Sequence, residues 1–138
     1  MICTFFGHRD TSWNIEPVLA KTVLELIANK GVTKFFVGYQ GNFDRIALSV
    51  LKQIKRTQPH IDFVVVLAYL TDKVDDCLTL YPEGLEKSPK RYAISARNKW
   101  MVENSDYVVT YITRDFGGAV QFKNFAKKKG KTVIELAL

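Results

Sequence analysis

Five short runs of apolar, β-branched and aromatic residues recur along the chain, and each has the length of a buried strand. Several of them are apolar at consecutive positions rather than at every second position. This pattern is typical of strands that are covered on both faces of a parallel sheet. The predicted strands are Ile2–Phe6, Lys34–Val37, Phe63–Leu67, Tyr107–Ile112 and Thr132–Leu136.

Four segments between these strands carry apolar residues at helical spacing and predict helices. They centre on residues 18–27, 46–54, 93–101 and 120–126. Pro17 suits the first turn of the first helix, and Gly31 suits its end. Asn42 or Asp44 is the candidate N-cap of the second helix, and Gly130 ends the fourth.

This alternation of strands and helices predicts a Rossmann-like α/β fold, a three-layer sandwich with a mostly parallel five-stranded sheet. Residues 1–138 have the length of one domain. The stretch Thr71–Arg91 is the one long irregular connection, and loops of that length are usually functional or mobile.

Composition places the chain among ordinary soluble proteins, with 47% hydrophobic and 25% charged residues. No apolar run approaches the ~20 residues of a membrane helix, so we expect no membrane partner. Residues 1–6 lack the basic start of a signal peptide. Cys3 and Cys77 have no metal-ligand spacing and suit reduced thiols. We therefore expect a cytoplasmic protein that needs neither a metal nor a cofactor.

The net charge of +6 is unevenly distributed along the chain. Residues 87–138 contain eleven Lys and Arg against four Asp and Glu, a net of +7, whereas residues 1–86 have a net of −1. A basic half favours anionic partners. The cluster Lys127–Lys129 by itself suits a solvated helix end, where cations complement the helix dipole.

Unusual residues follow the first two predicted strands, where ligands bind in open α/β sheets. Gly7, His8 and Arg9 follow the first strand and suit either an anion site or a simple turn. The second strand is followed by two glycines and two polar residues, which suit either close approach of a phosphate or a capped turn. These four residues are Gly38, Gly41, Asn42 and Asp44.

Two further features point to an anion. Gly117 and Gly118 open the fourth helix, where free backbone N–H groups can hold a phosphate, although a tight loop also uses glycine. Arg97, followed by Asn98, lies on the apolar stripe of the third helix. A guanidinium there must pair with another group or reach a cleft, because an unpaired buried charge is costly.

Taken together, these residues resemble the SLOG superfamily of Rossmann-like domains. This superfamily includes the phosphoribohydrolases of the Lonely Guy type, the DNA-processing protein DprA and standalone bacterial proteins of the YpsA type. The most specific part of the resemblance is the stretch Ala96–Asp106 followed by Gly117-Gly118. The resemblance implies a nucleotide-derived ligand with its phosphate at the glycine-rich helix start, and a homo-oligomer.

The phosphoribohydrolases use a Gly-Gly-x-Gly-Thr-x-x-Glu motif, and this chain departs from it. The Gly-Thr pair is absent, and Asn124 stands at the acidic position. Asn cannot donate or accept the catalytic proton. Three functions therefore stay open: binding or sensing of a phosphate-bearing nucleotide derivative, N-glycosidic cleavage with Asp44, Asp115 or Glu103 as the acid, and single-stranded DNA binding as in DprA.

Overall fold

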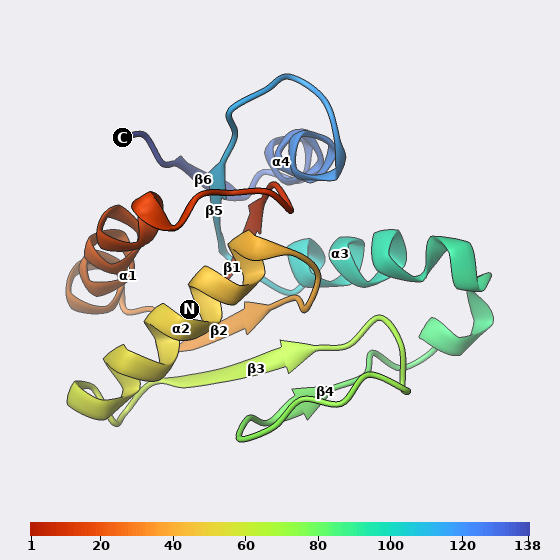
Figure 1. The fold of residues 1–138 in the computed structure, drawn as a ribbon, viewed down its shortest axis with the longest axis horizontal. Helices are drawn as coiled ribbons and strands as arrows, with labels where there is room; N and C mark the ends of the chain where they lie inside the picture. The colour runs from red at the N-terminus through yellow and green to blue at the C-terminus, as the bar shows by residue number, and fades with distance from the viewer.

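The computed structural model describes all of residues 1–138 and contains one sheet of six strands (Figure 1). The strands are β1 (Ile2–Gly7), β2 (Lys34–Val37), β3 (Asp62–Val66), β4 (Thr79–Leu80), β5 (Tyr107–Tyr111) and β6 (Thr132–Glu135). Their order in the sheet is β4-β3-β2-β1-β5-β6, and every neighbouring pair is parallel. The predicted α/β class and parallel sheet are confirmed.

The number of strands was predicted wrongly, because the sheet has six strands and not five. The sixth, β4, lies inside the stretch that the sequence presents as irregular. It has only two residues, too few for a periodic pattern. Backbone bonds from Val65 N to Leu78 O and from Leu67 N to Leu80 O attach this segment to β3. The five predicted strands match the observed ones to within one residue at each end.

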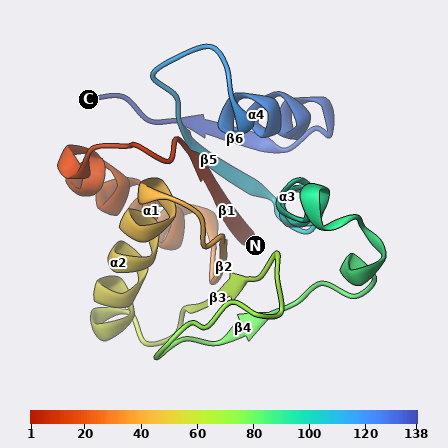
Figure 2. The same ribbon diagram turned by 45° about the vertical axis from the view of Figure 1, so that its right-hand side comes forward.

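Two helices cover each face of the sheet, so the three-layer arrangement is confirmed (Figures 1 and 2). α1 (Glu16–Lys30) and α2 (Asn42–Thr57) pack on one face over the larger core. α3 (Ala93–Glu103) and α4 (Gly118–Lys128) pack on the other face over a smaller core that contains Met101 and Phe122. None of these helices is both long and apolar enough to cross a membrane.

Some of the predicted helix ends are confirmed and one predicted cap is wrong. Pro17 lies in the first turn of α1, and Gly31 ends this helix with a left-handed φ of 68°, as predicted. The N-cap of α2 is Gly41, so the expectation that Asn42 or Asp44 caps this helix is wrong. Both side chains form other hydrogen bonds, described below.

The order in which successive strands are added to the sheet reverses at β1. The chain proceeds from β1 through β2 and β3 to one edge, then crosses to β5 and β6 on the other side of β1 (Figure 2). In open parallel sheets such a reversal leaves a crevice outside the carboxyl ends of the strands. The crevice expected here therefore lies above β1 and β5.

Candidate functional site

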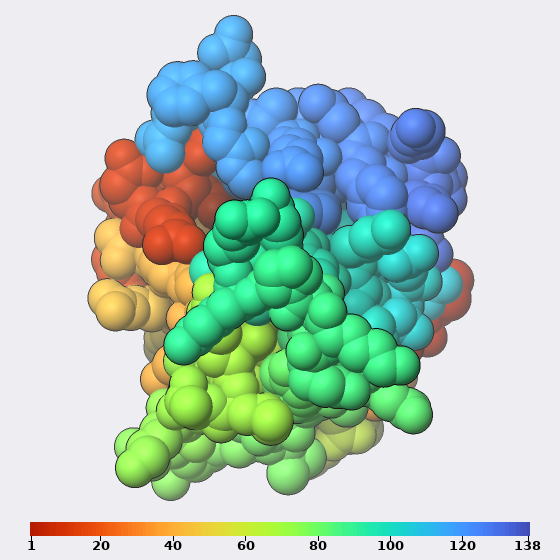
Figure 3. All heavy atoms as spheres, turned by 90° about the vertical axis from the view of Figure 1, so that its right-hand side faces the viewer, coloured from red at the N-terminus to blue at the C-terminus, as the bar shows by residue number.

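A cleft of about 280 Å³ lies at this reversal, between the end of β1, the first turn of α4 and the inner side of α3. In Figure 3 the segments that follow β1, β2 and β5 meet the start of α3 on one face of the molecule. Eight of the eleven predicted site residues line the cleft: Gly7, His8, Arg9, Asp44, Arg97, Asn98, Gly117 and Gly118. The other three, Gly38, Gly41 and Asn42, are not part of its lining.

The first turn of α4 is open toward the cleft. Gly117 precedes it with φ 103° and ψ 178°, a conformation essentially restricted to glycine. No side chain caps the helix, and apart from the adjoining backbone no atom lies within 4 Å of the position that a Cβ of Gly117 or Gly118 would occupy. The first N–H groups of a helix have no partner within the helix and lie at the positive end of its dipole. This end of the cleft therefore suits an anion.

Arg9 brings a free positive charge to the same cleft. Its side chain is exposed and forms no ion pair or hydrogen bond within the chain. Its backbone is held in place by the loop after β2. Asn42 N donates to Arg9 O at 2.9 Å, and the Asn42 side chain donates to Thr11 O at 3.2 Å. A Cβ on Gly41 would lie 2.6 Å from Arg9 Cα. Gly41 and Asn42 thus position the Arg9 loop.

Arg97 is almost completely buried, with 2% of its surface exposed. Its Nη1 donates to Val66 O at 2.9 Å, and its Nε donates to Asn98 Oδ1 at 2.8 Å. Its Nη2 donates to Gln40 Oε1 at 2.7 Å. Burial lowers the pKa of Arg97, an effect opposed by the charge of Asp44 and then of other neighbours. An arginine nevertheless stays protonated in proteins, so Arg97 is a permanent cation at the floor of the cleft.

Asp44 is the only carboxylate in the cleft lining. Its Oδ2 accepts a hydrogen bond from Gln40 N at 2.7 Å. Burial raises the pKa of Asp44 to about 6, although the positive charge of Arg97 opposes this shift. A Cβ on Gly38 would lie 2.9 Å from Asp44 Oδ2 and 3.2 Å from Arg97 Cζ. Gly38 therefore leaves the space in which these two side chains approach each other.

His8 and Gly7 connect the end of β1 to its neighbours. His8 is 5% exposed, and its Nε2 accepts a hydrogen bond from Thr113 N at 3.2 Å. Burial lowers the pKa of His8, and the charge of Arg114 lowers it further, so the ring is neutral near pH 7. A Cβ on Gly7 would overlap the ring of Phe43. The glycine thus allows the first turn of α2 to pack closely on β1.

Sequence reasoning did not single out two polar residues of the cleft, Arg114 and Gln40. Arg114 Nη1 donates to both carboxylate oxygens of Asp10, at 2.9 and 3.1 Å, while its buried Nε has no partner. Arg114 could have been found from the sequence, because it lies in the loop that follows a predicted strand. Gln40 stands between two glycines, and nothing in the sequence indicates that its side chain reaches Arg97.

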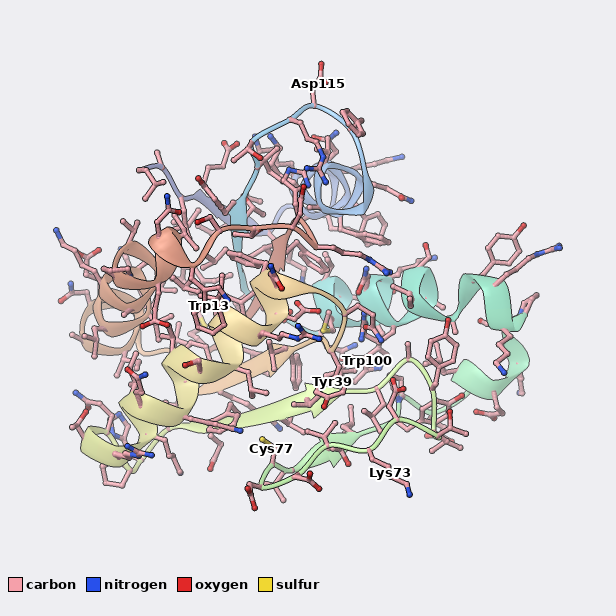
Figure 4. All side chains as sticks on the ribbon, in the orientation of Figure 1. Trp13, Tyr39, Lys73, Cys77, Trp100 and Asp115 are labelled. Carbon is pink, nitrogen blue, oxygen red and sulfur yellow. The ribbon has the colours of Figure 1, made fainter.

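The candidate acids and the lysine cluster lie elsewhere. Glu103 is exposed, with its Oε2 3.9 Å from Lys129 Nζ. Asp115 is at the outer end of the loop before α4 and points away from the cleft (Figure 4). Asn124 lies in a groove between α3 and α4, so a carboxylate at this position would also be outside the cleft. Within the lysine cluster, Lys127 pairs with Glu135 at 3.4 Å.

A larger hollow of about 500 Å³ lies over the solvent-facing side of α2 and is lined by side chains of its successive turns, including Arg45, Lys52 and Arg56. We assign the site to the smaller cleft because strand ends, a helix start and buried polar groups converge there. The structure contains no group of three or more His, Cys, Asp or Glu side chains that could hold a metal ion.

Compared with protein-family models and with curated proteins, the chain gives no match. A function for this chain is therefore inferred from the cleft and its residues.

Proposed function

We propose that this protein binds a phosphate-bearing, nucleotide-derived small molecule in the cleft at the carboxyl edge of the sheet. One observation carries the proposal: the uncapped first turn of α4 and the unpaired guanidinium of Arg9 face the same cleft. Backbone N–H groups at a helix start together with an arginine are a common way to hold a phosphate. Membership of the SLOG superfamily is part of the same proposal, and it predicts this location for the phosphate.

The charge balance of the lining supports an anionic ligand. Arg9, Arg97 and Arg114 contribute three positive charges, and Asp44 contributes at most one negative charge. Asp10 neutralises Arg114 from outside the lining. The cleft therefore keeps a positive excess even when Asp44 is ionised. A local excess of this kind attracts anions and raises their association rate.

The size and the apolar part of the cleft support a ligand of about mononucleotide size. Its volume of about 280 Å³ is just below the usual range of about 300–1,000 Å³ for small-molecule sites. Phe6, Ile94 and Met101 give it an apolar wall beside the charged groups. A pentose or a base can pack on such a wall while the phosphate faces α4 and Arg9.

Isothermal titration of the purified protein with AMP, ribose 5-phosphate, inorganic phosphate and adenosine tests the proposal. We expect heat of binding for the two phosphorylated sugars and none for adenosine at the same concentration. Arg9→Ala should weaken binding of both phosphorylated compounds at least tenfold, because it removes a charged hydrogen-bond donor. Arg45→Ala, on the exposed side of α2, is the matched control. Equal binding of adenosine and AMP would contradict the proposal.

A second candidate function is cleavage of the N-glycosidic bond of a nucleoside monophosphate, with Asp44 as the general acid. The observation that favours it is the raised pKa of Asp44, about 6, in a carboxyl group that lines the cleft. A carboxylic acid with such a pKa can deliver a proton near neutral pH. Chromatography of the free base released from AMP tests this activity, and Asp44→Asn should abolish it. Tight binding without release of base supports the binding function alone.

A further inference from the structure

Outside the cleft, α3 and α4 form an open groove of about 590 Å³ on the outer surface of the protein. Ala96, Phe122 and Phe125 line it with apolar surface, and Tyr92, 53% exposed, lies at its border. Lys99 and Lys128 also line the groove, and neither has an ion-pair partner. We call this surface the lysine-rimmed groove. Apolar surface bordered by unpaired cations suits a partner that is both apolar and acidic.

The chain itself carries a segment with that chemistry. Residues 70–78, here called the acidic loop, are the larger part of the connection from β3 to β4. Leu70 and Leu78 expose 68% and 72% of their surfaces, so both apolar side chains are free to contact a partner. Asp75 and Asp76, between them in the sequence, are also exposed. The acidic loop thus offers two apolar side chains and two carboxylates to solvent.

The backbone of the acidic loop is fixed at two points. The Tyr39 hydroxyl donates to Lys73 O at 3.3 Å, and Val65 N donates to Leu78 O at 3.0 Å. Val74 and Cys77 pack against the larger core, while the two leucines point outward. Figure 4 shows Lys73 and Cys77 on this segment, below Tyr39. Because the segment is already ordered, its binding to a partner costs little conformational entropy.

We propose that the acidic loop of one copy of this protein docks into the lysine-rimmed groove of a second copy. Leu70 and Leu78 then contact the apolar floor, and the carboxylates of the loop approach Lys99 and Lys128. The segment before β4 and helix α4 lie at opposite ends of the molecule in both Figure 1 and Figure 3. The contact therefore forms between copies and not within one.

The charges and the positions of the two surfaces determine the symmetry of this contact. A two-fold contact of groove against groove would bring the lysines of both copies together, and like charges repel. A loop-to-groove contact joins unlike surfaces that lie at opposite ends of the molecule, so the first contact leaves one copy with a free loop and the other with a free groove for the next copy. The surface involved is small, and a small contact is weak and transient. The proposal goes beyond nucleotide binding, because the lysine-rimmed groove and the acidic loop lie outside the cleft lining.

Sedimentation velocity of the full chain tests the proposal. The average mass should rise with protein concentration up to about 1 mM, as for weak complexes. The rise should be smaller in about 500 mM than in about 50 mM NaCl, because salt screens the charges. A parent protein that stays monomeric at about 1 mM in low salt overturns the proposal.

Two single variants distinguish this contact from a symmetric one. Leu78→Glu removes an apolar contact of the acidic loop and leaves the groove intact. Ala96→Glu places a negative charge in the groove and leaves the loop intact. Each variant alone should stay monomeric, and an equimolar mixture should form a one-to-one dimer that grows no further. Self-association of Leu78→Glu at the level of the parent, or a monomeric mixture, overturns the proposal.

Charge exchange at four exposed positions provides a version of the test that does not disturb the core. Asp75→Lys with Asp76→Lys, and Lys99→Glu with Lys128→Glu, should each weaken self-association at least tenfold. The combined fourfold variant should regain it. Lys52→Glu with Arg56→Glu on α2 is the control and should leave self-association close to that of the parent. A fourfold variant that remains as weak as the two double variants overturns the proposal.

Discussion

Arg97 and Gln40 are joined by a hydrogen bond of 2.7 Å from Nη2 to Oε1, which connects the middle of α3 to the loop after β2. The same guanidinium donates to Val66 O at the end of β3. One buried side chain therefore holds together a helix and the ends of two strands that are far apart in the sequence. Arg97 is consequently a structural residue as well as the cation at the floor of the cleft.

Replacement of Arg97 by alanine should destabilise the fold. The substitution leaves Gln40 Oε1 and Val66 O without their buried donor and removes the positive charge beside Asp44. Breaking a buried charged network of this kind costs about 3–5 kcal/mol. Thermal unfolding should show a melting temperature lower by roughly 10 °C or more. Arg9→Ala, an exposed residue without an internal partner, should change the melting temperature by no more than about 2 °C. Equal melting temperatures for Arg97→Ala and the parent would contradict the structural role.

Asp44 should make stability depend on pH. Its pKa is about 6 in the folded chain against 3.8 for a free side chain, so the folded state binds this proton more tightly. Stability from this group is therefore present at low pH and is lost as the pH rises through about 6, by roughly 2–3 kcal/mol in total. Asp44→Asn should remove this part of the pH dependence, because an amide does not titrate. Chemical denaturation of both proteins at pH 4.5 and pH 7.5 measures the difference.

The charge of Asp44 should also set the pH dependence of anion binding. Below pH 6 the protonated carboxyl group no longer repels an anion in the cleft, so affinity should rise severalfold between pH 7 and pH 5. Sulfate is the suitable probe, because its charge is constant over this range. In Asp44→Asn the affinity for sulfate should be high and nearly constant. A parent affinity that does not change with pH would show that the anion lies away from Asp44.

Most of the fold and the location of the cleft could be predicted from the sequence, because both depend on local patterns. Consecutive apolar residues predicted parallel strands. The glycines and the polar or charged residues that follow those strands predicted the edge of the sheet at which the cleft lies. The short strand β4 has no such pattern, since its pairing with β3 comes from backbone bonds near Leu78 and Leu80. Tertiary contacts of this kind cannot be derived from side-chain periodicity.

The individual roles of the glycines could not be predicted either. Gly7, Gly38, Gly41 and Gly117 all follow strands, and the sequence gives them similar candidate roles in anion binding. In the structure only Gly117, with Gly118, has open space on the cleft side. The other three accommodate Phe43, the pair of Asp44 and Arg97, and the backbone of Arg9. Which atom lies opposite a glycine depends on how distant elements pack.

Two adjacent glycines should therefore respond differently to the same substitution. Gly118→Ala meets no neighbouring atom and is in the first turn of a helix, so the melting temperature should be unchanged or slightly higher. Its methyl group would occupy the space in front of the free N–H groups, so affinity for AMP should fall at least tenfold. Gly117→Ala forces a side chain into φ 103°, which should cost about 1–3 kcal/mol of stability. Unchanged AMP binding by Gly118→Ala would exclude the start of α4 as the phosphate site.

Gly7→Ala should destabilise the fold through packing, not through loss of a ligand contact. A methyl group at this position would overlap the ring of Phe43, which is fully buried between α2 and β1. Overpacking of a core of this kind typically costs about 1–3 kcal/mol. Combination with Phe43→Leu should recover part of the loss, because the smaller side chain leaves room for the methyl group. Urea unfolding of both single variants and of the double variant measures the coupling between the two positions. If the losses in the free energy of unfolding of the two single variants simply add in the double variant, residue 7 and the Phe43 ring do not compete for the same space.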